Sequence, residues 1–268
     1  MLPESGSVLG VDVGWSLKQR SSAACRLDWD RDSVRWTIRR FTANEADRRD
    51  TLLATAGSQH LLAVAFDGPL RGDLGLINSY RMAERRLSER TIRDAIGKLA
   101  QSNTPGGRSL NGATNDCARV LVERAAIAEA THDHAVHRLA LAEAFPNSFL
   151  GLMLDDPAPF KGGRGKRSDR YFVALAEDGT LDRLLSHHLS GRTIAQDFAS
   201  VTNHDDRAAL VCAITALGVA RNDYVAVGDA DGWIILPPPA FIADWAQPLV
   251  AAWTDRDSSG SAWVYQNV

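Results

Sequence analysis

Residues 7–15 read SVLGVDVGW and place one carboxylate, Asp12, within an otherwise apolar run. A run of this kind is typical of a buried β-strand, where an ionised side chain is costly unless it is paired or neutralised. Two further strand-like runs follow, SSAACRLDWD at 21–30 and SVRWTIRRF at 33–41, and turns containing Gly, Ser or Asp separate the runs. We therefore expect the chain to begin with a meander of three strands, and Asp12 needs a physical explanation.

Length and composition are those of a folded α/β protein. The chain has 268 residues, of which 45% are hydrophobic, and this suffices for a sizeable core. A net charge of -3 gives no global attraction to nucleic acid, so contact with a polyanion needs a local basic patch. The three cysteines are scattered, without a C-x-x-C pair, and neither a signal peptide nor a membrane-spanning run is evident. We expect a cytoplasmic protein that does not enter a membrane.

The rest of the chain alternates helical and strand-like segments, which favours one α/β domain over residues 1–268. A loop insertion is expected at about 100–117, where Gly, Pro, Asn and Ser are frequent. The other expected elements are helices at 43–57, 79–99, 118–130, 169–189 and 206–221, strands at 61–66 and 137–146, and a hairpin at 224–239.

Three strands carry a carboxylate within the strand or at its C-terminal end: Asp12, Asp67 and Glu143. In an open α/β sheet this edge is where ligands bind. Several ionised carboxylates side by side repel one another unless a cation neutralises them. Oxygen ligands without a clear Cys or His set indicate Mg²⁺ or Mn²⁺, and two such ions about 4 Å apart suit phosphoryl transfer.

The late helix offers a fourth carboxylate. Asp206 shares a helical stripe with Leu210, Ala213 and Leu217, so we expect it to point inward as a metal ligand, with a first-turn partner of the helix dipole as the alternative. Asp205 follows Thr202 by three positions, which is close to a capping box and favours stabilisation of the helix start.

Six motifs, in this order and spacing, resemble those of a known family. They are GVDVGW at Asp12, AFDGPL at Asp67, RMAERRL with Arg81 and Glu84, EAFPNSFL at Glu143, DDRAALVCAITA at Asp206, and GDADGWIILP near the C-terminus. Together they resemble a domain-of-unknown-function family, number four hundred and twenty-nine, of predicted nucleases with a ribonuclease H-like fold.

The resemblance implies a ribonuclease H-like core, a mixed five-stranded sheet whose first three strands are antiparallel, with flanking helices. It implies that Asp12, Asp67, Glu143 and Asp206 are catalytic metal ligands of a nuclease that hydrolyses DNA or RNA. One departure concerns Ala208, which stands where many relatives have a further Asp before the "AL" of the late helix. If that acid is the ligand elsewhere, Asp206 has to substitute for it here.

Basic residues supply candidates for phosphate binding. Lys161, Lys166 and Arg167 lie on the Gly-rich stretch KGGRGKRSDR, which could grip phosphates or form a solvated loop. Arg81 could bind substrate or pair locally with Glu84 at i, i+3.

Two other functions remain open. Asp12-Val-Gly14-Trp-Ser16 fits the D-x-G-x-S/T phosphate loop of actin-like ATPases and sugar kinases, which would make the protein a phosphotransferase. Those proteins usually need two such domains, and the C-terminal half has no second loop of this pattern. The third class is a non-catalytic binding module of the same fold.

Overall fold

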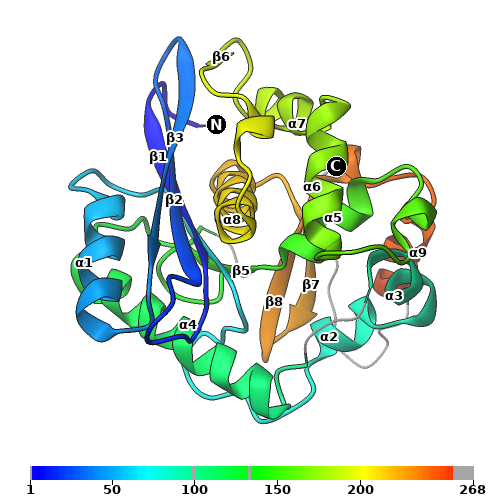
Figure 1. Cartoon of the computed structure of the whole chain (residues 1–268), viewed down its shortest axis with the longest axis horizontal. Coiled ribbons are helices and arrows are strands. Elements are labelled where there is room, and N and C mark those ends of the chain that lie inside the picture. Colours follow the sequence, from blue (N-terminus) through cyan, green and yellow to red (C-terminus); the bar gives the residue numbers. More distant parts are fainter. Residues whose placement is uncertain (1, 98–100, 132–133, 256–268) are drawn as a thin grey trace.

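One mixed β-sheet with helices on both faces forms the framework (Figure 1). The computed structural model describes residues 2–97, 101–131 and 134–255. Within them the sheet has eight strands in the order β6-β3-β2-β1-β4-β5-β8-β7. The strands are β1 Gly6–Asp12, β2 Ser22–Trp29, β3 Ser33–Phe41, β4 Val64–Asp67, β5 Leu141–Ala144, β6 Thr193–Ile194, β7 Val225–Asp229 and β8 Gly232–Leu236.

The strand pairing confirms the N-terminal meander and the C-terminal hairpin. β1 to β3 pair antiparallel, as do β7 and β8, whereas β1, β4, β5 and β8 pair parallel in that order. The sheet exceeds the expected five strands because the hairpin joins β5 through β8. The two-residue strand β6 also joins the edge at β3, and it is too short to leave a periodic pattern in the sequence.

Helices cover both faces of this sheet. They are α1 Glu45–Ala56, α2 Met82–Leu87, α3 Arg90–Ile96, α4 Pro105–Arg124, α5 Pro146–Met153, α6 Arg167–Glu177, α7 Thr180–His188, α8 His204–Arg221 and α9 Gln247–Asp255. In Figure 1, α1 and α4 lie on one side of β1 to β3, and α8 lies on the other, with α5 to α7 beyond it. None of the helices in the described ranges has both the length and the apolarity to cross a membrane.

The expected loop insertion at 100–117 is wrong, because residues 105–117 belong to α4. Thr104 caps this helix by accepting a hydrogen bond from Gly107 N at 3.1 Å, and Pro105 occupies its first turn. Its buried face is partly polar: the amide of Asn111 donates to Pro69 O at 2.7 Å and its oxygen accepts from Ile77 N at 3.0 Å. Those buried amides replace the apolar stripe that identifies a helix in sequence. The helix expected at 118–130 accordingly ends at Arg124.

Two other expected helices are each divided in the structure. The helix expected at 79–99 is α2 followed by α3, since the backbone is extended at Glu89, and residues 98–99 lie outside the described ranges. The helix expected at 169–189 is α6 followed by α7, because Gly179 takes a left-handed conformation with φ of 75°.

Helix α8 packs directly on β1 at Gly10. A Cβ atom at Gly10 would overlap the backbone of Ala209 and Ala213. Gly10 therefore lacks a side chain so that the helix can approach the strand. This contact places the first turn of α8 above the C-terminal end of β1.

Gly10→Ala should lower the free energy of unfolding by about 2 kcal/mol or more, because the helix would have to move off the strand. Urea unfolding followed by circular dichroism measures the change. Gly112→Ala in α4 is the matched control, since a Cβ atom there meets nothing within 4 Å. That variant should stay within about 1 kcal/mol of the wild type, on the stabilising side. Equal stability of the two variants would contradict the packing argument.

Candidate functional site

Asp12 and Asp67 lie side by side at the carboxyl ends of two parallel strands. Asp12 is the last residue of β1, Asp67 is the last residue of β4, and the two are register partners. Register partners on neighbouring strands point to the same face of a sheet, which here is the face covered by α8. Asp12 is 8% exposed. The structure therefore places two of the four predicted acids together, at the sheet edge expected from the sequence.

The pKa values of both carboxyl groups are raised. Burial raises the pKa of Asp67 to about 7; the charge of Glu143 adds to the rise, and a hydrogen bond with Asp12 opposes it. Burial also raises the pKa of Asp12 well above its usual value, and the charges of Asp67 and Asp205 raise it further. Without a cation the pair retains a proton near neutral pH. A divalent cation would relieve the same repulsion.

Asp205, which the sequence suggested as a capping residue, interacts electrostatically with Asp12. The cap of α8 is Asn203, whose side-chain oxygen accepts from Asp205 N at 2.9 Å and from Asp206 N at 3.3 Å. Asp205 is thus not needed as a cap, and its charge contributes to the raised pKa of Asp12. The sequence did place Asp205 in the first turn of this helix, next to Asp206, so either acid was a candidate for the site.

Asp206 points away from Asp12 toward the meander. Its Oδ1 lies 3.5 Å from Nε of Arg40 on β3. Burial raises its pKa, and Arg40 opposes the rise. Asp206 therefore faces the sheet as predicted, but it lies over β2 and β3. The structure does not bring it to the Asp12–Asp67 pair.

Glu143 lies on the opposite face of the sheet. Its register partner on β4 is Phe66, whereas Ala144 is the partner of Asp67. Alternation along β5 then directs Glu143 away from the face that carries Asp12 and Asp67. Both of its carboxylate oxygens accept hydrogen bonds from Arg81, each at 2.7 Å, and one also accepts from Leu70 N at 2.9 Å. Arg81 thus occupies the oxygens that a metal would need.

Arg81 belongs to a buried ionic network. The residue is 1% exposed, and its Nε also donates to Glu84 at 2.9 Å. Glu84 in turn accepts from Ser102 N through both oxygens, at 3.2 Å each. A substrate-binding role does not fit Arg81, because its guanidinium is enclosed by the two carboxylates. The network joins β5 and α2 to the segment that precedes α4.

Of the basic residues on the Gly-rich stretch, Lys166 is the one associated with the acidic pair. It is exposed at the N-terminal boundary of α6, and its charge opposes the raised pKa values of Asp12 and Asp67. Lys161 is also exposed. Arg167 turns inward instead, beside Gly97 and Tyr171, and its buried Nη1 has no hydrogen-bond partner in the described ranges. Phosphate contact therefore fits Lys166 better than Arg167.

The loop after β1 has its polar groups engaged. Gly14 N donates to Ser22 Oγ at 2.9 Å, and Ser16 Oγ accepts from Gln19 N at 3.0 Å. A phosphate loop of the kinase type needs free backbone amides and a free hydroxyl at these positions. This arrangement gives the phosphotransferase alternative no support.

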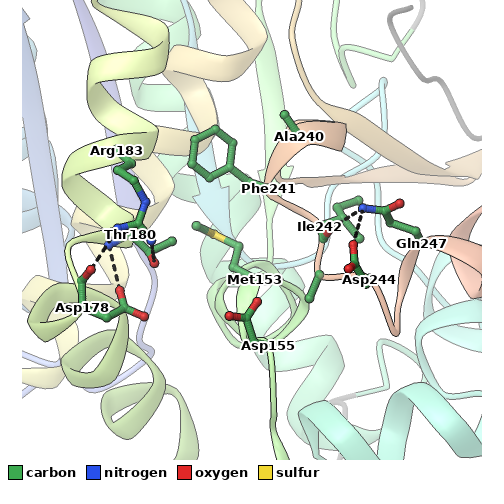
Figure 2. A pocket seen from close by; sticks show the side chains of 11 residues that line it. Met153, Asp155, Asp178, Thr180, Arg183, Ala240, Phe241, Ile242, Asp244 and Gln247 are labelled. Atoms are coloured by element: carbon green, nitrogen blue, oxygen red, sulfur yellow. Dashed lines mark hydrogen bonds between the residues drawn. The ribbon is translucent and has the colours of Figure 1, made fainter.

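Two concavities lie on the side of the sheet occupied by β5 and β8. The first, of about 30 Å³, is lined by Asp67, Arg81 and Glu143 among others, which is room for about one water molecule. The second, of about 270 Å³, lies between α7 and the segment after β8. Figure 2 shows its carboxylates Asp155, Asp178 and Asp244, with Arg183 held by Thr180.

The four predicted ligands do not gather around one point. Among the described residues, the group of three metal-binding side chains whose ligand atoms all lie within 4.8 Å is His187, His188 and Asp223. Asp12 and Asp67, at the carboxyl ends of β1 and β4 (the β1–β4 edge), do not form such a group of three with another carboxylate among the described residues.

In comparisons with known proteins, no family model matches the chain, and neither a curated protein nor a solved structure matches it significantly.

Asp67→Asn should stabilise the protein at neutral pH. The pKa of this carboxyl group is near 4 in the unfolded chain and about 7 in the folded protein. The free energy of unfolding therefore falls as the pH rises from about 4 toward about 7, because ionisation is easier in the unfolded chain. The amide removes this cost, so the free energy of unfolding at pH 8 should increase by about 1 to 3 kcal/mol, with little change at pH 4. Thermal unfolding across this pH range measures it, with Asp32→Asn as the exposed control.

Arg81→Met should destabilise the protein by about 3 to 5 kcal/mol, because Glu84 and Glu143 would remain as buried, unpaired charges. Arg85→Met, an exposed change in the same helix, should cost less than about 0.5 kcal/mol. Urea unfolding of both variants checks the difference. Wild-type stability of Arg81→Met would mean that Glu143 is not held as described.

Proposed function

We propose that the protein is a metal-dependent phosphodiester hydrolase that acts on DNA or RNA, with a ribonuclease H-like core. The observation that carries the proposal is the paired placement of Asp12 and Asp67 at the ends of two parallel strands, with pKa values raised by burial and by neighbouring carboxylates. Perturbed carboxyl groups of this kind cluster at catalytic sites. The N-terminal meander followed by parallel strands agrees with the family that the motifs resemble.

The donor set fits a hard divalent cation. Asp12 and Asp67 would hold Mg²⁺ or Mn²⁺ with carboxylate oxygens, and Asp205 would take the place that the sequence assigned to Asp206. Glu143 fits this role poorly, since Arg81 binds both of its oxygens. When bound, the cation would supply Lewis-acid activation of the phosphodiester and of the attacking water.

The chain's own residues then position the substrate. Lys166 is exposed and close enough to affect both carboxyl groups, so it would contact a phosphate that approaches the pair. The adjoining cavity of about 30 Å³ cannot enclose a nucleotide. A nucleic-acid strand whose phosphate backbone approaches Asp12 and Asp67 from solvent therefore suits the site better than a small substrate that has to be enclosed.

Hydrolysis of single-stranded, duplex and branched DNA and RNA with Mg²⁺ or Mn²⁺ tests the proposal. Asp12→Asn and Asp67→Asn should each reduce the cleavage rate by about a hundredfold or more. Asp205→Asn should reduce the cleavage rate more than Asp206→Asn does, because Asp206 is paired with Arg40. Cleavage by the wild type that survives Asp12→Asn would refute the site. Binding of nucleic acid without cleavage would indicate the non-catalytic module.

Lys166→Ala should raise KM for an oligonucleotide and leave kcat less affected, because the lysine contacts phosphate without touching the reacting atoms. Lys161→Ala is the matched control, an exposed lysine on the same Gly-rich stretch, and should have a smaller effect. The salt dependence of KM should also become shallower for Lys166→Ala. Equal effects of the two substitutions would argue for a diffuse basic surface.

A further inference from the structure

A second cluster of metal-binding side chains lies at the other end of α8. His187 and His188 end α7, and Asp223 follows the C-terminal end of α8. One ligand atom from each of the three residues lies within 4.8 Å of the others. An 18-residue helix is about 27 Å long, so this cluster is well separated from Asp12 and Asp67.

His188 is the unusual member of the cluster. It is 2% exposed, and neither Nδ1 nor Nε2 has a hydrogen-bond partner among the residues that the structure describes. A buried imidazole with both nitrogens unpaired is costly, and a neutral nitrogen is also what a transition metal binds.

The other two ligands face this ring. Nε2 of His187 lies 2.7 Å from Oδ2 of Asp223, and the rings of His187 and His188 are 5.4 Å apart. The His187–Asp223 pair by itself would be a bond between two helices. It leaves the nitrogens of His188 unexplained, since His188 hydrogen-bonds to neither partner.

We propose that His187, His188 and Asp223 bind a zinc-class transition-metal ion that ties α7 to the end of α8. Two imidazoles and one carboxylate are a ligand set typical of zinc, and ligand atoms on a tetrahedral zinc ion lie about 3.3 Å apart. The 2.7 Å contact therefore has to widen, and any separation between about 3.3 Å and the upper limit of 4.8 Å has to shorten. Side-chain rotation of the partly exposed His187 and Asp223 accommodates both changes.

The surroundings permit an ion at this point. Nε of Arg221 lies 3.8 Å from Oδ2 of Asp223, and its Nη1 donates to His188 O at 2.9 Å. The arginine side chain is 36% exposed, so solvent screens its repulsion of a cation. The ring of Phe241 packs at 5.3 Å from that of His187. Phe241 also lines the pocket of Figure 2, so it lies between that pocket and the cluster. A fourth position would face solvent beside His187.

Zinc titration of the metal-free full chain, by calorimetry and by competition with a chromophoric chelator, tests the proposal. About one equivalent should bind to the wild type. His187→Ala and Asp223→Asn should each weaken binding at least about tenfold, whereas His60→Ala, an exposed histidine elsewhere, should not. Both substituted ligands are partly exposed, so the variants should fold. Co²⁺ should give the visible absorption of tetrahedral coordination in the wild type and lose it in His187→Ala.

Absence of a zinc equivalent, or zinc binding that survives both ligand substitutions, would overturn the proposal. Loss of zinc binding in Asp12→Asn with retention in His187→Ala would assign the ion to the acidic pair and also overturn it. Nuclease activity in Mg²⁺ does not enter these measurements, so the two metal proposals succeed or fail separately.

Discussion

The close approach of α8 to β1 at Gly10 is the contact on which the arrangement of both candidate sites depends. It holds the first turn of α8, with Asp205, above the end of the strand that carries Asp12. Cys212 in the middle of the helix lies near enough to the pair that, after burial, the charges of Asp67 and Asp12 raise the pKa of its thiol. The same helix ends beside α7, where Asp223 meets the two histidines. One helix, buried from Ala208 to Val219, therefore spans the distance between the sites.

Strand register then decides which carboxylates can act together. Parallel pairing brings Asp12 and Asp67 onto one face, and Glu143 falls on the other because it lies one residue before the level of that pair. Its charge still reaches Asp67 and raises the pKa of that residue. Arg81 neutralises Glu143 by a bidentate contact that is buried on both sides. Glu143, which the sequence suggested as a metal ligand, thus links β5 to the start of α2 through Arg81.

The sequence alone predicts the parts of this structure that depend on local patterns. Alternating and continuous apolar runs locate the meander and the strand that ends at Asp67, and Gly57 correctly ends the first helix. It does not predict the part of α4 before residue 118, because the buried face there uses Asn111 and its neighbours as hydrogen-bonding groups in place of an apolar stripe. Nor can it separate Asp205 from Asp206, since the choice depends on which way α8 turns over the sheet. Long-range register and helix rotation are properties of the packed molecule.

The two candidate sites differ in the physical reason for which each would take a metal. At the β1–β4 edge, repulsion between buried carboxyl groups favours a hard cation that neutralises charge. At the α7–α8 junction the buried member, His188, has no hydrogen-bond partner within the described part of the chain, so the gain would come from coordination of an imidazole nitrogen. Oxygen-only and mixed nitrogen–oxygen donor sets select different ions. If both proposals hold, the difference in donors would give each site its own metal, even though a single helix connects them.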